Sequence, residues 1–256
     1  MKLGFPTNPR RDIFEEINWI ADNGFDFVDL FLEPDKSIPS NLDAERIRGC
    51  IRSRNMDVVG HTAWYIPIGS PMKDLCETSF SILTEHIDFF SNIGCDKMTV
   101  HANWPPSLFS VEEGIFFQSK ILKRLTDFAM NTGVRIMYEP LTSLKDSIEN
   151  VAEILKVNDK VYFHLDTGHA NLHGRSPIDF IKKFKDRLIH IHLHDNNGKD
   201  DLHLPLGSGN IDWKKIIDEL IPFYNDTITL EIFSHDRDYV LMSKNKLEEY
   251  IASKKQ

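Results

Sequence analysis

Histidines and carboxylates recur along this sequence at the ends of short apolar runs, where a buried strand would stop. The residues that share this position are His61, His101, Glu139, Asp166, His192 and Glu231. Imidazole and carboxylate groups are the ligands that divalent cations prefer in proteins. One such residue alone is commonly a helix cap or a satisfied core group. Six of them gathered in one place indicate a metal site, because buried carboxylates repel one another unless a cation neutralises them.

The elements that must position these residues follow a regular alternation. Short runs rich in Val, Ile and Phe alternate with longer segments of helical spacing, such as residues 12–24, 74–94 and 111–133. The predicted strands are Lys2–Phe5, Phe27–Phe31, Asp57–Gly60, Lys97–His101, Arg135–Glu139, Val161–Asp166, Leu188–Leu193 and Thr227–Glu231. Eight such units in 256 residues predict one domain over residues 1–256, with the fold of a single (β/α)₈ TIM barrel.

In that fold the carboxyl ends of all strands meet on one face, where the active sites of TIM barrels lie. Residues far apart in the sequence therefore become neighbours there. His190 and His192 lie two positions apart on the seventh predicted strand and point to the same side. His194 follows at the same period, and we expect only the later two, His192 and His194, to come close enough to this face to meet a metal, and His190 to be a polar member of the barrel interior.

Composition narrows the classes of partner. The chain has 30 Lys and Arg against 39 Asp and Glu, which gives a formal net charge of -9 and weighs against a nucleic-acid or acidic-membrane partner. A run of about 20 apolar residues, the length needed to cross a bilayer, is not found, and the N-terminus lacks the apolar segment of a signal peptide. We therefore expect a cytoplasmic protein without membrane contact. Cys50, Cys76 and Cys95 lack metal or redox spacing and are expected to be reduced thiols. A homo-oligomer is compatible with the sequence.

Three motifs carry a resemblance to a known family. DTGHA at residues 166–170, HLHDNNGKDDLHLPLGSGNIDW at 192–213 and TLEIF at 229–233 resemble the xylose isomerase-like TIM barrel superfamily over essentially the whole chain. Two of its branches matter here. One contains sugar phosphate isomerase- and epimerase-like proteins, and the other is the endonuclease IV family (AP endonuclease family 2), which cuts DNA at abasic sites.

The two branches imply different metal sites. The sugar branch implies one divalent ion, Mn²⁺ or Zn²⁺, held by Glu139, Asp166, His192 and Glu231. The endonuclease branch implies up to three zinc ions and adds His61, His101, His169, Asp201 and His203. The sugar branch commonly keeps the same histidines for substrate groups. The presence of all nine residue types therefore leaves the number of ions open.

The leading interpretation is a divalent-metal-dependent isomerase or epimerase of a sugar or sugar phosphate. Glu139 and Glu231 would transfer a proton beside a carbonyl held by the metal, one carboxylate removing it and the other returning it. The candidates for contacts with this small-molecule substrate are Glu33, Trp64, His101, His169 and Arg10, the last together with its neighbour Arg11. Trp64 either floors a sugar pocket or wedges into a DNA stack.

Two alternatives belong to other classes. A zinc-dependent apurinic/apyrimidinic endonuclease would use the ions to activate water against a flipped-out abasic nucleotide. The acidic balance and the lack of a Lys/Arg cluster between Asn196 and Trp213 favour the sugar over DNA. A barrel that binds metal and sugar without turnover is the second alternative. The paired Glu139 and Glu231 count against it, because a binding protein needs no such pair.

Overall fold

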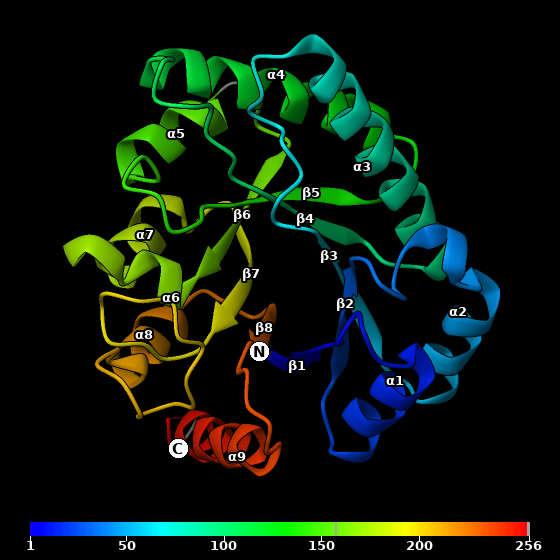
Figure 1. Cartoon of the computed structure of the whole chain (residues 1–256). Coiled ribbons are helices and arrows are strands. Elements are labelled where there is room, and N and C mark those ends of the chain that lie inside the picture. Colours follow the sequence, from blue (N-terminus) through cyan, green and yellow to red (C-terminus); the bar gives the residue numbers. More distant parts are fainter. Residues whose placement is uncertain (157, 255–256) are drawn as a thin grey trace.

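Eight parallel strands close into a barrel in chain order, with the helices around it as an outer ring (Figure 1). The computed structural model describes residues 1–156 and 158–254. Strand β1 pairs with β8 through Lys2 and Thr227, which closes the barrel. This confirms the predicted (β/α)₈ TIM barrel. The predicted single domain of residues 1–256 also includes 157, 255 and 256, which lie outside the described residues.

The strands and helices lie close to the predicted ranges. The strands are β1 (Lys2–Pro6), β2 (Phe27–Leu32), β3 (Asp57–Thr62), β4 (Lys97–His101), β5 (Arg135–Glu139), β6 (Val161–Asp166), β7 (Leu188–Leu193) and β8 (Thr227–Leu230). The helices are α1 (Ile13–Asp22), α2 (Ala44–Ser53), α3 (Lys73–Ile93), α4 (Val111–Ala129), α5 (Ile148–Lys156), α6 (Thr167–Ala170), α7 (Pro177–Phe184), α8 (Trp213–Leu220) and α9 (Asp238–Ser253). Two short 3₁₀ turns are η1 (Pro39–Asn41) and η2 (Leu172–Gly174).

Local sequence explains where the helices begin and end. The Asp12 side chain accepts hydrogen bonds from the backbone of Phe14 and Glu15 and starts α1. Ser110 and Glu113 form a reciprocal capping box at the start of α4. Gly94 ends α3 in the left-handed conformation, with φ of 84°. The caps at Asp12 and Ser110 fix where α1 and α4 begin, and Gly94 fixes the connection into β4.

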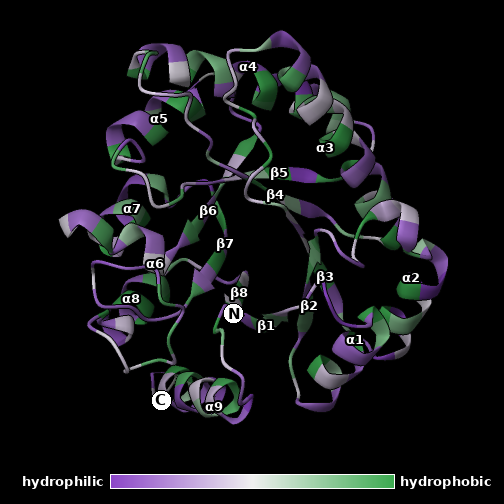
Figure 2. Cartoon of the chain, viewed as in Figure 1, coloured by the Kyte–Doolittle hydropathy of each residue, from purple (hydrophilic) through white to green (hydrophobic). Residues whose placement is uncertain are grey.

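The apolar core fills the space between barrel and helices. Ile17 and Ile47 on the helices and Leu30 and Val100 on the strands are almost completely buried there. Figure 2 shows hydrophobic and hydrophilic stretches alternating along the helices of the ring. Such one-sided helices bury their apolar stripe against the sheet and leave the polar side to solvent.

Inside the barrel the lining changes from apolar to polar. Phe27, Val59 and Met137 form a small apolar cluster of their own. Gly4 is required beside it, because a Cβ there would lie 2.3 Å from the Phe27 ring. Two positions further along the strands, Asp29 and His61 are buried instead. Since side chains of a strand alternate between its faces, the residues two positions on point into the same interior. The site therefore rests on a polar tier rather than on the usual branched aliphatic one.

The ends of two strands differ from the prediction. His61 was expected after the third strand, but it lies inside β3, whose pairing with β2 continues to Thr62. Glu231 was expected to end the eighth strand, but it directly follows β8. The three cysteines are unpaired thiols. In the described part of the chain, no helix has the length and hydropathy needed to cross a membrane.

Candidate metal centre and substrate cavity

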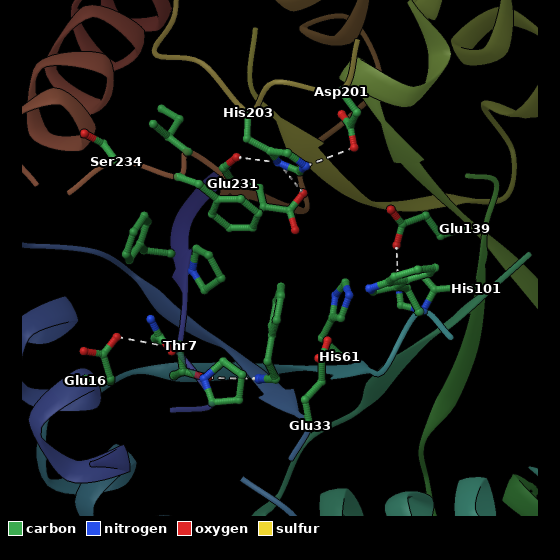
Figure 3. A pocket seen from close by; sticks show the side chains of 18 of the residues that line it. Thr7, Glu16, Glu33, His61, His101, Glu139, Asp201, His203, Glu231 and Ser234 are labelled. Carbon is green, nitrogen blue, oxygen red and sulfur yellow. Dashed lines mark hydrogen bonds and ion pairs between the residues drawn. The ribbon is translucent and has the colours of Figure 1, made fainter. Parts of the chain in front are cut away.

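A cavity of about 810 Å³ opens at the carboxyl ends of the strands (Figure 3). Most of the predicted site residues line it: Glu33, His61, Trp64, His101, Glu139, His169, Asp201, His203 and Glu231. Glu139 reaches it from the end of β5, and Glu231 reaches it from the segment after β8. Topology alone thus gathers side chains from strands and loops that are distant in sequence.

Asp166 and His192 lie just beneath this cavity and complete the predicted four-ligand set. His192 Nδ1 is 3.0 Å from Glu231 Oε2 and 3.8 Å from Asp166 Oδ2. His169 Nδ1 is 3.8 Å from Asp166 Oδ1 and 3.4 Å from Glu139 Oε1. The four residues therefore face one small volume, with His169 beside them.

On one side of that volume lie His61, His101 and Glu139, the β3–β5 half of the site. His101 Nε2 is 3.1 Å from Glu139 Oε2, and the rings of His61 and His101 are 4.6 Å apart. Burial, reinforced by His101, lowers the pKa of His61 to about 3. Among the described residues, His61 Nδ1 and His101 Nδ1 are buried and accept or donate no hydrogen bond. These nitrogens are available to a cation or to a polar substrate group.

On the other side lie His169, Asp201 and His203, which form the β6–β8 half together with Asp166, His192 and Glu231. Asp201 Oδ2 lies 3.2 Å from His169 Nε2 and 3.1 Å from His203 Nε2. His203 Nδ1 is 3.0 Å from the Glu231 carbonyl oxygen. Burial lowers the pKa of His203, but Glu231 and Asp201 outweigh it and raise the pKa to about 11. His203 also has φ of 48°, an uncommon conformation for a residue with a side chain and one often found at functional sites.

The loop that carries Asp201 and His203 is organised by Asp195. Its carboxylate accepts hydrogen bonds from the backbone N–H groups of Gly207, Gly209 and Ile211. A Cβ on Gly209 would lie 2.1 Å from the Asn196 carbonyl oxygen, so the LGSGN stretch needs its second glycine. These contacts hold the loop within residues 192–213 in one conformation.

Local contacts also fix the conformation of the DTGHA motif. The Asp166 side chain accepts a hydrogen bond of 2.7 Å from the backbone N–H of His169 and begins the short helix α6. A Cβ on Gly168 would lie 1.9 Å from the His194 ring. The His194 ring in turn lies 3.0 Å from Asp166 Oδ1 through Nε2. Asp166 is thus both a helix cap and a member of the site.

Both glutamates of the site are buried and ionised. Burial raises the pKa of the Glu139 carboxyl, but His164 and His101 lower it well below its usual range. Likewise, His192 and His203 outweigh burial and lower the pKa of Glu231. Unpartnered imidazole nitrogens beside clustered carboxylates form a donor set that fits a divalent cation such as Mn²⁺ or Zn²⁺.

Two arginines that are neighbours in the sequence differ in their position relative to the cavity mouth. Arg11 lines the cavity, whereas Arg10, the residue expected to contact substrate, is absent from the lining. Trp64 lines it with 59% of its surface exposed. Glu33 is partly buried, and burial together with Glu231 raises its pKa against the opposing influence of His101. Arg237 also lines the cavity but is bound to the buried Glu16 at 2.6 Å.

Sequence reasoning missed two residues that contact the site, Asp29 and His164, whereas His194 was expected near this face. Asp29 Oδ2 lies 2.8 Å from His192 Nε2, and His164 Nδ1 lies 3.2 Å from Glu139 Oε2. The ring of His194 stacks on that of His203 at 4.0 Å. A period of two was the signal available for His164, which lies two positions before Asp166. His190 lies in the barrel interior as expected, 2.8 Å from Thr227 Oγ1.

Comparison with known proteins places this chain. Residues 17–253 match the family described as xylose isomerase-like TIM barrel. The chain belongs to that family. It is 29% identical over 207 residues to the uncharacterized protein MJ1311 of Methanocaldococcus jannaschii, across 73% of this chain and 70% of the relative. It is 31% identical over 169 residues to an inosose dehydratase of Clostridium botulinum (strain Eklund 17B), across 60% of this chain and 55% of that enzyme.

Solved structures share the same barrel. A D-tagatose 3-epimerase-like protein superposes with a TM-score of 0.87 at 24% identity, covering 98% of this chain and 97% of the other. The IOLI protein, solved with a zinc atom, superposes with a TM-score of 0.84 at 15% identity and covers 99% of both chains. At these identities the likeness establishes the common fold.

Proposed function

We propose that this protein is a divalent-metal-dependent isomerase or epimerase of a sugar or sugar phosphate. The observation that carries the proposal is the pair of buried, ionised carboxylates, Glu139 at the end of β5 and Glu231 just after β8, which reach one cavity as part of a set suited to a metal (Figure 3). The names of the related proteins, a D-tagatose 3-epimerase-like protein and an inosose dehydratase, support a polyhydroxylated substrate.

The ion would be held by residues of both halves: Glu139, Asp166, His192 and Glu231. When bound, a divalent ion polarises a carbonyl and offsets negative charge that develops on its oxygen. The zinc atom in the solved IOLI protein supports this choice of cofactor. All four residues are buried, so an ion held by them would lie in a site of low solvent exposure.

The proton transfer falls to the two glutamates. Their low pKa values keep both carboxylates deprotonated and ready to accept a proton from the carbon beside a carbonyl. Each has an imidazole neighbour: His101 Nε2 lies 3.1 Å from Glu139 Oε2, and His203 Nδ1 lies 3.3 Å from Glu231 Oε2. At these ion-pair distances the histidines hold the carboxylate that takes the proton in position. In epimerisation one glutamate accepts the proton from one face of the carbon, and the other returns to the opposite face a proton that it takes from its histidine neighbour.

Substrate recognition would rest on the remaining lining. Glu33 and His169 offer polar atoms for hydroxyl groups, and Trp64 offers an aromatic face at the mouth. Of the two arginines named from the sequence, Arg11 lines the cavity. Because its guanidinium is 55% exposed and its carboxylate neighbour Glu16 is 3.6 Å away, it remains able to meet a phosphate group.

One observation favours a second candidate, an endonuclease IV-like enzyme that incises abasic DNA. His61, His101 and Glu139 offer ligand atoms within 4.8 Å of one another, and so do His169, Asp201 and His203. Charge argues the other way. Arg237 at the mouth is already neutralised by Glu16, and the chain carries a net charge of -9, whereas DNA affinity depends strongly on cationic contacts.

A substrate screen separates these candidates. Chelated protein is reloaded with Mn²⁺, Co²⁺ or Zn²⁺ and incubated in D₂O with ketoses, sugar phosphates and inososes, and deuterium uptake is followed by NMR. We expect metal-dependent exchange at one carbon beside a carbonyl. An abasic-site oligonucleotide is incubated in parallel with the Zn²⁺-loaded protein. Incision without exchange in any sugar would replace our proposal by the nuclease, and sugar binding without exchange would indicate a binding protein.

A further inference from the structure

A buried aspartate lies beneath the metal ligands and is used by none of the steps above. Asp29 on β2 is fully buried inside the barrel. Its Oδ2 accepts hydrogen bonds of 2.8 Å from His192 Nε2 and 2.8 Å from Thr229 Oγ1, and His190 Nε2 lies 3.4 Å away. A carboxylate is costly to bury, and this tier of a TM barrel is ordinarily aliphatic. The position of Asp29 therefore calls for a functional reason.

The hydrogen bonds of Asp29 determine which nitrogen of His192 carries hydrogen. Three donor groups converge on Asp29 Oδ2, namely the Thr229 hydroxyl, His192 Nε2 and His190 Nε2, which is the arrangement of an ionised carboxylate. An ionised carboxylate can only accept hydrogen bonds. His192 Nε2 must therefore be the protonated nitrogen in this contact. The opposite nitrogen, Nδ1, is the one that faces Glu231 Oε2 and Asp166 Oδ2.

We propose that Asp29 is a positioning residue of the metal centre, which keeps hydrogen on His192 Nε2 and so presents the Nδ1 lone pair to the ion. The inference rests on the proposed function, because it takes His192 as a metal ligand. Carboxylates that accept the outer N–H of a coordinating histidine fix its ring and raise its basicity.

Asp29 also ties together strands that carry ligands. It extends from β2, and its partners lie across the barrel: His192 on β7, and Thr229 on β8 two positions before Glu231. The His192 ring is further held between neighbours, with the rings of His164 at 4.2 Å and His61 at 5.1 Å. The Asp29 carboxylate thus orients the His192 ring, which its neighbours already restrict in rotation.

Metal affinity of the Asp29→Asn variant tests the proposal. The substitution keeps the shape but removes the charge. We expect binding of Mn²⁺ and Zn²⁺, measured by titration calorimetry on chelated protein, to weaken 10- to 100-fold. The matched control is Thr227→Val, which removes the hydroxyl beside His190 in the same tier without touching Asp29 or His192. Its affinity should stay within about twofold of wild type. Unchanged affinity in Asp29→Asn, or an equal loss in both variants, would overturn the proposal.

A second measurement does not depend on the variant folding. In wild-type protein loaded with Zn²⁺, ¹⁵N NMR of the histidine rings reports which His192 nitrogen bears hydrogen. We expect a slowly exchanging hydrogen on Nε2 and metal on Nδ1. The reverse assignment would overturn the proposal. Neither measurement requires turnover, so a failed substrate screen and a failed positioning role give different results.

Discussion

The two halves of the site use histidine in opposite ways. In the β3–β5 half, His61 is held neutral, since burial lowers its pKa to about 3, and its Nδ1 has no hydrogen-bond partner among the described residues. In the β6–β8 half, burial also lowers the pKa values of His192 and His203, but neighbouring carboxylates raise them above the ordinary range. His61 thus offers a free lone pair, whereas His192 and His203 hold protons.

The number of carboxylates explains this difference. The β3–β5 half contains Glu139 alone, whereas the β6–β8 half contains Asp166, Asp201 and Glu231. A buried imidazole without a close carboxylate loses its proton because the charged form is poorly solvated. With carboxylates at about 3 Å, the charged form is favoured. The protons of the β6–β8 half therefore balance its acids in the metal-free protein, and a cation must displace them when it binds.

The largest expected effects come from two single substitutions, each of which removes the catalytic glutamate of one half. Glu139→Gln and Glu231→Gln should each lower epimer or isomer conversion by roughly 10²- to 10⁴-fold, the usual contribution of a general acid or base. If each half serves one face of the carbon, each variant should retain solvent exchange with one epimer and lose it with the other. Deuterium uptake by NMR measures this. The control is Glu77→Gln on α3, where the carboxylate accepts hydrogen bonds from Arg124 at the surface. Full turnover in either site variant would contradict the mechanism.

The next effect concerns which half holds the ion. Asp166→Asn should weaken metal binding by more than about 100-fold, because even outer partners of a ligand contribute 10- to 100-fold. His61→Gln should change the affinity by less than about tenfold if a single ion uses the four-ligand set. Titration calorimetry gives both values and the stoichiometry. A large loss in His61→Gln with little change in Asp166→Asn would move the ion to the β3–β5 half.

The strands and the rim were predictable because both follow from short-range patterns. Val- and Ile-rich runs at regular intervals predicted all eight strands to within a few residues, and a parallel barrel then fixes where their ends meet. Boundaries shifted where hydrogen bonding rather than composition decides. Thr62 still pairs with Leu32, so His61 lies inside β3.

The supporting residues were harder to find because their roles depend on partners across the barrel. Asp29 stands in the run FVDLFL, where nothing local indicates that its carboxylate meets His192 on β7. His164 lies two positions before Asp166, so a period of two indicated its direction but not its contact with Glu139. Arg10 and Arg11 were both candidates, and only Arg11 lines the cavity, a difference that depends on the three-dimensional course of the loop.

The number of protons released on metal binding measures the difference in histidine protonation between the two halves. The pKa values of His169, His192 and His203 are raised. At pH 6 all three imidazoles are therefore in the positively charged, doubly protonated form in the metal-free protein. Binding of Mn²⁺ should therefore become tighter as pH rises, since fewer protons compete for the ligand. A single ion on His192 should release about one proton, and ions that also use His169 and His203 about three. Calorimetry in buffers of different ionisation enthalpy counts them. Affinity independent of pH would contradict the assigned charge states.

The smallest effect should come from the exposed aromatic side chain that each half places at the mouth. Trp64 follows β3 and Phe233 follows β8, each with 59% of its surface exposed, and both line the cavity. An aromatic contact of about 1 kcal/mol corresponds to roughly a fivefold change in affinity. We therefore expect Trp64→Ala to raise KM about fivefold with little change in kcat, because the contact serves binding rather than proton transfer. Phe233 also stacks on His203 at 4.3 Å, so Phe233→Ala should lower kcat as well. Equal effects of the two variants on kcat would show that His203 does not depend on this stacking and that the two sides of the mouth act alike.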